Sequence, residues 1–444
     1  MLNLFESYTD ETAMLYNSLQ TAGFTQATVV VEDNGFLPDE VESPYKYYIE
    51  KTEPLKKGKP LFFNQVKIPK YWEIIGDSKE AGIYDLGKKR ANINYTEPKD
   101  RRLVKEVAWL DDKQNIRLVE HYNKYGWCYA KTSYNLRAEP ITTAYFTASG
   151  KEIIVENHVT KDITLAYAGK IYNFPSKTDF VVHYLKLRKF DLERIFYNSL
   201  AVPFFVVLRL SSEMENQALL FWQEAITEKI PDNMKMILNA EEKSTQKIIL
   251  TDRIAYLRLR KLVPINVKSR IKQLGYIYKI VRKNQLRPVT LTLTDTDQVE
   301  KLEELVSSTP EVTFNVAALT DMSNKLLRLL KYPNIVLYPN ANTQRLKILW
   351  DEADIYLDIN HSNEVRDATR RAFENNMLIL GFENTVHRPQ LINEENVYAV
   401  SDAQLMGKKL QKIAQTPEFM EKLLKNQEEY SDEMNISKYQ EVLK

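Results

Sequence analysis

The sequence has few glycines, one cysteine and no long apolar run, and each shortage excludes a class of protein. Glycine accounts for 12 of 444 residues, below the usual share of about 7%, and no glycine-rich dinucleotide or P-loop motif occurs. The single cysteine, Cys128, has no partner for an internal disulfide. The longest apolar run, 200–208, has nine residues and contains a proline, whereas a membrane span takes about 20. The sequence therefore excludes P-loop chemistry, a disulfide framework and a membrane-spanning helix, and it favours the cytoplasm.

The sequence also lacks an overall excess of positive or negative charge. Lys and Arg number 61 against 60 Asp and Glu, a formal net charge of +1, so no global field attracts nucleic acid and we expect no nucleic-acid partner. One local excess stands out, because the stretch from Arg253 to Thr294 holds eleven basic residues and no acidic one. Such a stretch suits a phosphate, an anionic membrane or simply the solvated face of an amphipathic helix. Peripheral contact with the inner face of the cell membrane is therefore kept as one hypothesis.

The first half of the chain alternates between two kinds of pattern. A helix at 10–19 and a strand at 27–32 predict an α/β unit, and short alternating runs with turn signals follow, which predict an antiparallel meander. After residue 180 the α/β pattern returns, with a strand at 204–208, a helix at 216–227, a strand at 234–238 and a helix at 246–261.

The second half has a clearer rhythm of strands and helices. Five strands are predicted, and helices join them; this is the pattern of a doubly wound sheet. The strands are expected at 289–293, 312–316, 334–338, 355–359 and 378–380, the helices between them at 299–307, 323–330, 343–350 and 365–375, and two more helices at 402–415 and 417–430. We expect three domains: 1–40 with 186–265, an inserted β-sheet domain at 41–185, and 266–444.

Catalytic signatures are mostly absent. The five histidines lie too far apart in sequence to form a local metal or relay motif. Asp295, Thr296 and Asp297 match the D-x-D motif that binds a divalent metal and a sugar nucleotide in one class of glycosyltransferase. The motif also stands where a strand gives way to a helix, so capping by an aspartate explains it without a metal. We expect capping, no metal and no cofactor.

Two short stretches carry a resemblance to a known family. The segment from Glu32 to Asp39 reads EDNGFLPD, and Ser43 to Tyr45 reads SPY. Together with the order of the segments, they resemble the non-catalytic stabilising subunit of the peptide O-GlcNAc transferase of the bacterial accessory secretion system. The resemblance covers essentially the whole chain. It implies a GT-B-like α/β fold, in which two Rossmann-like domains face a cleft and an antiparallel β-meander domain is inserted.

The same resemblance implies partners. Members of this family join a catalytic transferase subunit, as a heterotetramer, to glycosylate a Ser/Thr-rich polypeptide acceptor, the serine-rich repeat adhesin. Retaining enzymes of this architecture carry two glutamates eight residues apart after a strand of the C-terminal domain, with a glycine after the first. Here Glu364 matches the first glutamate, but Val365 replaces the glycine and Ala372 stands at the second position. Basic residues after the first strand of that domain are replaced by Asp295 and Asp297.

These three losses predict weak or absent sugar-nucleotide binding and no catalytic residue. The first hypothesis is therefore a pseudo-glycosyltransferase that binds and stabilises the catalytic subunit and helps it hold its acceptor. Its acceptor or cleft candidates are Asn34, Phe36, Tyr45, His361, Asn363, Glu364 and Arg366. The alternative is an active retaining glycosyltransferase with divergent residues, in which Glu364 and the arginines at 366, 370 and 371 handle the sugar nucleotide. The three arginines are also explained as the solvent-exposed face of a helix. On the same helix, Val365, Ala368 and Ala372 form an apolar stripe at helical spacing.

Overall fold

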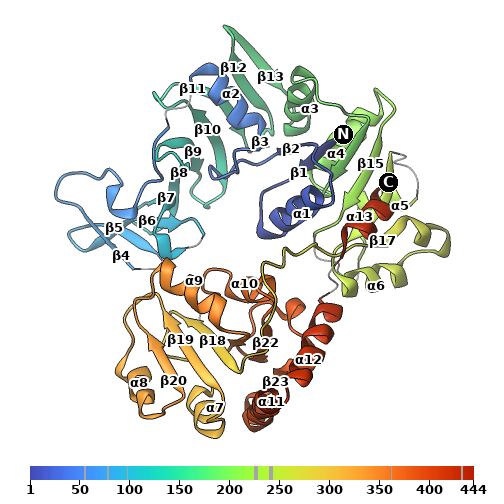
Figure 1. Cartoon of the computed structure of the whole chain (residues 1–444). Coiled ribbons are helices and arrows are strands. Elements are labelled where there is room, and N and C mark those ends of the chain that lie inside the picture. The colour runs from blue at the N-terminus through green and yellow to red at the C-terminus, as the bar shows by residue number, and fades with distance from the viewer. Residues whose placement is uncertain are drawn as a thin grey trace. The chain divides into compact units, whose positions relative to one another are not determined.

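The computed structural model describes residues 1–444 except 55–56, 78–79, 98, 225–228, 240–243, 362 and 432–433. The chain divides into two compact units (Figure 1): Met1–Gly275 with Ile436–Lys444, and Tyr276–Asn435. The finer division into three domains remains a prediction. Within the described residues, no helix has both the length and the apolar character needed to cross a bilayer.

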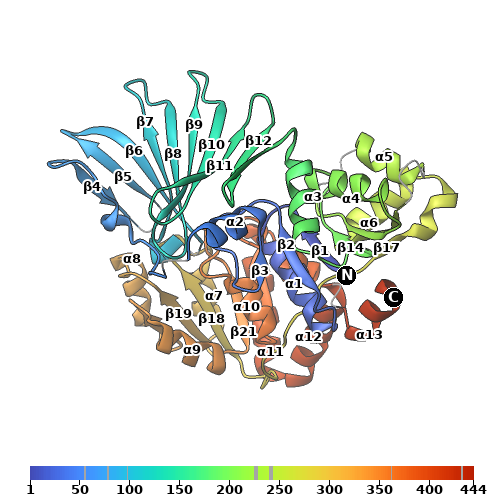
Figure 2. The same cartoon turned by 90° about the horizontal axis from the view of Figure 1, so that it is seen from above.

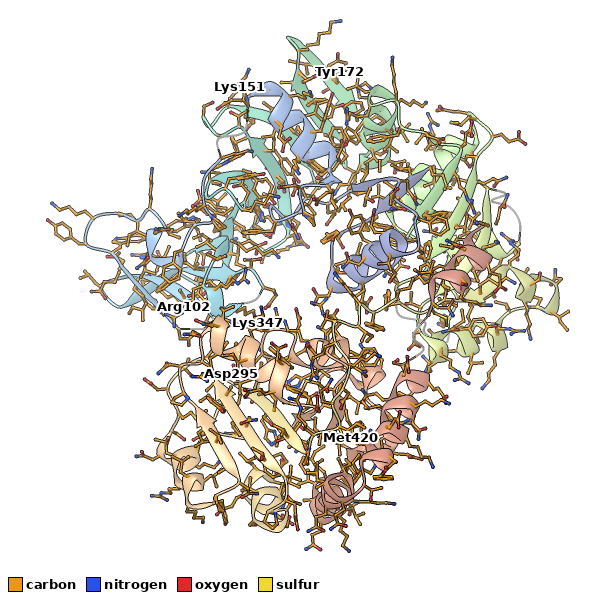
Figure 3. The ribbon with its side chains drawn as sticks, in the orientation of Figure 1. Arg102, Lys151, Tyr172, Asp295, Lys347 and Met420 are labelled. Atoms are coloured by element: carbon orange, nitrogen blue, oxygen red, sulfur yellow. The ribbon has the colours of Figure 1, made fainter. Side chains whose placement is uncertain are left out.

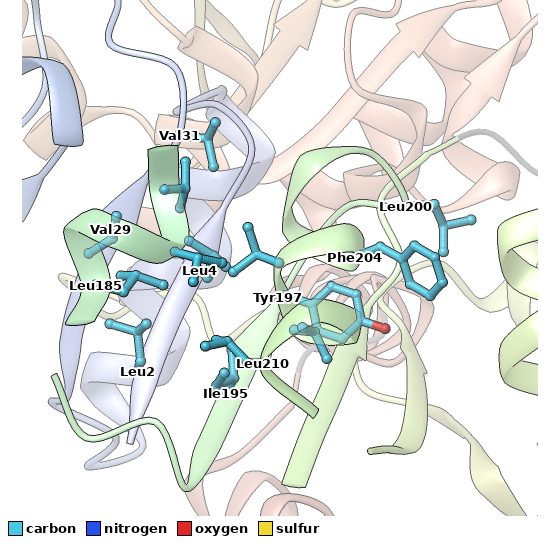
Figure 4. Close-up of a cluster of buried hydrophobic side chains, with 14 of the residues drawn as sticks. Leu2, Leu4, Val29, Val31, Leu185, Ile195, Tyr197, Leu200, Phe204 and Leu210 are labelled. Atoms are coloured by element: carbon cyan, nitrogen blue, oxygen red, sulfur yellow. The ribbon is translucent and has the colours of Figure 1, made fainter. Parts of the chain in front are cut away.

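The first unit is built on a seven-stranded parallel sheet in the order β17-β16-β15-β14-β1-β2-β3. Its strands are mostly apolar and buried, as expected where helices cover both faces, and Figure 4 shows part of the resulting core. The strands are β1 (Leu2–Phe5), β2 (Ala27–Val30), β3 (Val41–Glu42), β14 (Arg194–Tyr197), β15 (Gln217–Phe221), β16 (Thr245–Leu250) and β17 (Ile271–Gln273). The helices are α1 (Asp10–Thr21), α2 (Pro44–Thr52), α3 (Lys177–Leu187), α4 (Val202–Ser211), α5 (Asp232–Leu238), α6 (Arg253–Leu262) and α13 (Ile436–Leu443).

Four predicted elements between residues 200 and 262 were wrong. The expected strand at 204–208 lies in α4, and the expected helix at 216–227 holds β15, although its residues 225–227 fall outside the described part. The expected strand at 234–238 is α5, and the expected helix at 246–261 is divided between β16 and α6. A short apolar run has no period that separates a buried strand from a buried helix. Pro203 in the first turn of α4 was the overlooked signal, because proline is favoured there.

A ten-stranded antiparallel sheet interrupts the parallel one, as predicted, and its strands follow the chain in order from β4 to β13. Figure 2 shows it as a fan of neighbouring hairpins. Helix α2 packs on β10 and β11. The strands are β4 (Glu73–Gly76), β5 (Ala81–Asp85), β6 (Lys88–Tyr95), β7 (Val104–Leu110), β8 (Ile116–Tyr122), β9 (Cys128–Tyr134), β10 (Pro140–Phe146), β11 (Glu152–Asn157), β12 (Ile163–Tyr167) and β13 (Lys170–Phe174).

The second unit contains a six-stranded parallel sheet in the order β20-β19-β18-β21-β22-β23. All five predicted strands are present, and β23 is added at one edge. The strands are β18 (Val289–Thr294), β19 (Thr313–Ala318), β20 (Ile335–Tyr338), β21 (Ile355–Asp358), β22 (Leu378–Phe382) and β23 (Val397–Tyr398). The helices are α7 (Leu302–Ser308), α8 (Asn324–Leu327), α9 (Thr343–Glu352), α10 (Ala368–Glu374), α11 (Ala403–Gln415) and α12 (Pro417–Tyr430). Two parallel sheets with an inserted antiparallel sheet confirm the predicted α/β class.

Candidate functional site

The parallel sheet of the second unit has one point at which ligands are expected. Strand β18 pairs with β19 on one side and with β21 on the other, so the strand order reverses between β18 and β21. Doubly wound sheets bind ligands outside the carboxyl ends of the strands at such a point. A nucleotide site is therefore expected at the loops that follow β18 and β21.

These two loops are tied to each other by hydrogen bonds. Thr294 Oγ1 donates to Asn360 Oδ1 over 2.7 Å. Backbone bonds also join the loops, from His361 N to Gln298 O at 3.1 Å and from Glu300 N to Ile359 O at 2.8 Å. Because these polar groups pair within the chain, they are not available to hold the phosphates of a donor.

Glu364, the remaining carboxylate of the expected pair, is also engaged within the chain. Its Oε1 accepts from Thr369 N at 3.0 Å in the first turn of α10, and its Oε2 accepts from Arg388 Nε at 2.7 Å. Arg388 donates in addition to Asp367 Oδ1 over 3.1 Å. Glu364 therefore accepts a hydrogen bond from the first turn of α10. Its negative charge is neutralised by Arg388, which lies 24 residues later in the sequence.

The apolar stripe predicted on this helix is confirmed. Ala368 and Ala372 are fully buried, and Val365 is 7% exposed, in a core cluster that also contains Phe373. The position that carries the second glutamate in the catalytic pattern is thus part of the hydrophobic core. Of the neighbouring arginines, Arg370 donates to Asp367 Oδ2 over 2.9 Å.

The prediction that the D-x-D motif caps a helix was wrong. Helix α7 begins at Leu302 and is preceded by Lys301 in a left-handed conformation, without a side-chain cap. Asp295, labelled in Figure 3, instead lines a hollow of about 140 Å³ together with Asp297 and Asp321. Within the described ranges no three His, Cys, Asp or Glu side chains are placed to hold a metal ion. Three carboxylates around one hollow repel a diphosphate.

A buried cluster around Asp358 was missed at the level of sequence. Asp358 ends β21 and is fully buried, and its carboxylate pairs with His387 Nδ1 at 2.6 Å and with the backbone N of His387 at 2.8 Å. Thr369 Oγ1 donates to the same carboxylate over 3.1 Å. The position of an aspartate at the carboxyl end of a strand was the available signal. The cluster connects β21 to α10 and to the loop after β22.

The candidates in the first unit lie where the opening α/β segment meets the meander. Asn34 Oδ1 accepts from Phe36 N at 2.9 Å, and Tyr129 of β9 donates its hydroxyl to Asp33 O over 2.8 Å. Tyr45 is 1% exposed, donates to Glu156 at 2.9 Å, and stacks on the ring of Tyr145 at 4.3 Å. The motif that carried the resemblance therefore anchors this segment to the meander.

The structure brings the other four candidates onto a single loop of the second unit. His361 and Asn363 are exposed, and Glu364 and Arg366 are half-buried. His361 Nε2 lies 2.7 Å from Glu300 Oε2. Arg366 and Asp367 both have positive φ angles, 51° and 54°, so this loop turns sharply before α10 begins.

The sheet of the first unit has its own reversal point, which the sequence analysis missed. Strand β1 pairs with β2 on one side and β14 on the other. After these strands come Glu6 and Asn198, and Glu6 N donates to Asn198 Oδ1 over 2.9 Å. Glu6 Oε2 is buried and has no hydrogen-bond partner among the described residues. Burial, together with the charge of Glu32, raises the pKa of Glu6 from 4.5 to about 7.

The chain is similar to known protein families along most of its length. Models of the GtfB N-terminal, middle and third domains match residues 2–48, 72–175 and 177–262, and a GftB/GlyA-F C-terminal domain model matches 290–427. A Streptococcus gordonii protein named UDP-N-acetylglucosamine--peptide N-acetylglucosaminyltransferase stabilizing protein GtfB is 42% identical over 444 residues, covering 100% of this chain and 98% of its own. The chain belongs to the GtfB family.

A second curated relative and a solved structure support the assignment to the GtfB family. A GtfB stabilizing protein of Streptococcus pneumoniae is 38% identical over 444 residues, with 100% of this chain and 99% of its own covered. A chain in the crystal structure of a GtfA/B complex bound to UDP and GlcNAc is 42% identical and superposes with a TM-score of 0.92, covering 100% of this chain and 99% of that one. The resemblance proposed from the sequence is confirmed. Because these relatives are named as stabilizing proteins of the transferase, the prediction of a non-catalytic chain is also confirmed.

One prediction concerns Glu6 of this GtfB-family chain. Between pH 4.5 and about 7 the folded state holds a proton on Glu6 that the unfolded state releases, so the free energy of unfolding falls as pH rises through this range. We expect Glu6→Gln to raise the free energy of unfolding by about 2 kcal/mol near pH 8 and to change it little near pH 4. Urea denaturation at both pH values measures this, with the exposed Glu215→Gln as the control. An equal effect of the two variants would contradict the role of burial.

Proposed function

We propose that this chain binds and stabilises a catalytic O-GlcNAc transferase subunit, in a heterotetramer, and helps it hold a Ser/Thr-rich polypeptide acceptor. The single observation that carries this proposal is the full-length likeness to a chain of the GtfA/B complex, with a TM-score of 0.92 and 42% identity. The protein acts without a cofactor of its own.

The arrangement of the second unit supports a binding role rather than a transferase role. Glu364 is paired with Arg388, and the position of the second catalytic carboxylate is a buried alanine. The hollow beside Asp295 is lined by carboxylates. A nucleotide sugar carries a diphosphate, so each of these features weakens its binding. The exposed His361 and Asn363, and the half-buried Arg366, stay candidates for contact with the acceptor.

The meander supplies surfaces suited to a partner chain. Its sheet is open, with β4 and β13 at the two edges, and edge strands present backbone groups that can pair with another chain. Apolar side chains are exposed on both edge strands, with Ile75 58% and Ile171 72% exposed. Tyr71, just before β4, is 83% exposed.

Two measurements test the proposal. Co-expression of the catalytic subunit with and without this chain is expected to show that the chain increases both the soluble yield of its partner and acceptor glycosylation. Calorimetry of the isolated chain with UDP-GlcNAc is expected to show no binding. Unchanged yield and glycosylation would contradict the stabilising role, and micromolar donor binding or donor hydrolysis would support the active-transferase alternative.

A second role, peripheral contact with an anionic membrane, is favoured by helix α6. Ile254 is 66% and Leu257 48% exposed, and Ile265 just beyond the helix is 86% exposed. Arg258 and Lys261 are exposed on the same helix, a combination suited to an anionic lipid surface. The protein is then cytoplasmic with a reversible membrane contact. Sedimentation with vesicles of phosphatidylglycerol is expected to be salt-sensitive, and absence of binding at low salt eliminates this role.

A further inference from the structure

A row of hydrogen-bonded side chains crosses the meander from β8 to the end of β11. His121 Nε2 lies 2.9 Å from Thr132 Oγ1, and Thr132 Oγ1 lies 2.9 Å from Thr143 Oγ1. Thr143 Oγ1 in turn lies 2.7 Å from His158 Nε2. Strands β9 and β10 place the two threonines opposite each other in the register. Neighbouring strands lie about 4.8 Å apart, so the three steps from β8 to β11 extend over roughly 14 Å. These four residues form the His-Thr row.

A carboxylate stands at each end of the His-Thr row. Glu106 Oε1 of β7 lies 3.4 Å from His121 Nδ1, and Glu156 Oε1 of β11 lies 3.8 Å from His158 Nδ1. The two histidine side chains are half-buried, 22% and 24% exposed. The ring of Tyr129 lies 6.4 Å from that of His121 and stays uncharged, because burial raises the pKa of its hydroxyl well above its ordinary value. Each histidine therefore places Nδ1 near a carboxylate and Nε2 near a threonine.

The two carboxylates differ in how their charge is compensated. Lys177 Nζ lies 2.9 Å from Glu156 Oε1, whereas Lys105 Nζ lies 4.0 Å from Glu106 Oε1. The hydrogen bond with His121 holds the pKa of Glu106 below its ordinary value. At the Glu106 end the compensating proton therefore belongs on the histidine, and at the Glu156 end a lysine already supplies the compensating charge.

Burial and one pair of lysines oppose a positive charge on the ring of His158. Burial has the largest effect and lowers the pKa of His158. Lys177 and Lys161 lower this pKa further, and Glu156 and Glu32 raise it. The result is a lowered pKa, so this ring stays neutral at the pH, about 6.5, at which an ordinary histidine is half protonated.

The three hydrogen bonds of the row determine where its protons lie. Each bond uses one proton, and each threonine hydroxyl supplies one. Thr132 and Thr143 are 6% and 7% exposed, and within the described residues their hydroxyls bond only to members of the row. The third proton therefore comes from Nε2 of one histidine, and the other histidine accepts on its Nε2. Two positively charged rings would bring a fourth proton and leave one buried hydroxyl without an acceptor.

We infer that the His-Thr row takes up a single proton and reverses the direction of its hydrogen bonds when that proton leaves. In the protonated state His121 carries a proton on both ring nitrogens, and its Nδ1–H faces Glu106. The hydroxyls of Thr132 and Thr143 both donate toward His158. This second histidine accepts on Nε2 and carries its own proton on Nδ1, so all three bonds are made with one charged ring.

Release of the proton removes one proton from the row and shifts three others. Each bridging proton moves across its own hydrogen bond, from His121 Nε2 to Thr132, from Thr132 to Thr143 and from Thr143 to His158 Nε2. The Nδ1 proton of His158 passes to solvent. His121 keeps its Nδ1–H toward Glu106, whereas direct loss of this proton would place a bare nitrogen beside the less compensated carboxylate.

The row connects β8 with the place where two helices join the meander. Glu156 accepts from Tyr45 of α2 over 2.9 Å and lies 2.9 Å from Lys177 of α3. The protonation state of His121 therefore decides whether the nitrogen of His158 that faces this junction carries a proton. The device belongs to the first unit alone and does not depend on the proposed function.

An NMR titration of the histidine rings in the full-length chain tests the inference. The ring nitrogens are isotopically labelled, the pH is varied from about 5 to 8, where histidine titrates, and His121→Gln and His158→Gln assign the signals. As the pH rises through the midpoint of His121, we expect His158 to lose the proton on Nδ1 and to gain one on Nε2 at the same midpoint. A ring that titrates independently changes instead from two protonated nitrogens to one.

Variants of the threonines separate the row from other effects. Thr143→Val removes one hydroxyl and keeps a β-branched side chain, and we expect the change of tautomer at His158 to be lost. Thr132→Val removes the other hydroxyl and serves as the second variant if Thr143→Val fails to fold. Thr142→Val is the matched control, since Thr142 is the neighbour on β10 but its hydroxyl lies 2.8 Å from Ser133 Oγ, outside the row. We expect this variant to keep the coupled change.

Each other outcome overturns the inference. If His158 becomes doubly protonated at the midpoint of His121, or keeps one tautomer there, the row does not share a single proton. A coupled change that survives both Thr143→Val and Thr132→Val would mean that the hydroxyls do not carry the protons. If Thr142→Val also abolishes the change, the effect belongs to β10 as a whole. The proposed function stands in every case, because co-expression tests it separately.

Discussion

Ala372→Glu, which restores the second carboxylate of the catalytic pattern, is expected to unfold the second unit instead of creating a donor site. Ala372 is fully buried beside Val365 and Phe373. An uncompensated charge in such a core costs at least about 4 kcal/mol, a large part of the stability of a typical domain. Urea denaturation followed by circular dichroism measures the loss, and calorimetry with UDP-GlcNAc checks for donor binding.

The neighbouring Arg371→Glu provides a matched control. Arg371 is exposed on the same helix, so it receives the same new side chain without burial. We expect its effect on the free energy of unfolding to stay within about 1 kcal/mol. A stable Ala372→Glu protein that binds UDP-GlcNAc would show that this core is a donor site lacking only its carboxylate, and would contradict the closed arrangement described above.

Gly35→Ala is expected to destabilise the first unit by about 3 kcal/mol or more, because two costs combine. Gly35 has a φ angle of 79°, and a Cβ added there would lie 2.7 Å from Tyr122 O and 2.8 Å from the ring of Tyr129. The backbone of β8 cannot yield as a flexible side chain does. Thermal unfolding is expected to begin at a markedly lower temperature than in the wild type.

Gly150→Ala separates the conformational cost from the steric one. Gly150 has a similar φ angle, 86°, but no atom lies within 4 Å of the added Cβ. Its substitution is expected to cost only about 1–2 kcal/mol, the penalty for a left-handed backbone. Equal losses for the two variants would mean that the contact between the 32–39 segment and the meander adds nothing to stability.

The sequence predicted most of the fold where local signals were strong. Five of the six strands of the second sheet were predicted, because these apolar strands are separated by amphipathic helices of ordinary length, whereas β23, with only two residues, was missed. The meander was predicted from alternation and from turn residues such as Ser149 and Gly150. Between 200 and 262 the assignments were wrong, because α4 is apolar on nearly all sides and carries no clear helical period. Strand β1 was missed because it has only four residues at the start of the chain.

The candidate site was predictable only in part. Local spacing was enough to foresee that Ala372 joins Val365 and Ala368 on a buried stripe. The partners of the polar residues were not foreseeable, since Arg388 lies 24 residues after Glu364 and His387 lies 29 after Asp358. The unpartnered oxygen of Glu6 depends on burial, which spacing does not predict. Contacts between distant segments require the folded chain.

The position of helix α13 determines when the first unit can complete its fold during synthesis. Helix α13 belongs to the first unit: Tyr439 is fully buried and donates to Gly275 O over 2.8 Å, and Lys247 of β16 donates to Val442 O over 2.6 Å. A ribosome releases these residues after residues 276–435. The first unit therefore cannot complete its fold until residues 276–435 have been synthesised. In a nascent chain stalled before residue 436, the surface that α13 covers stays exposed to solvent.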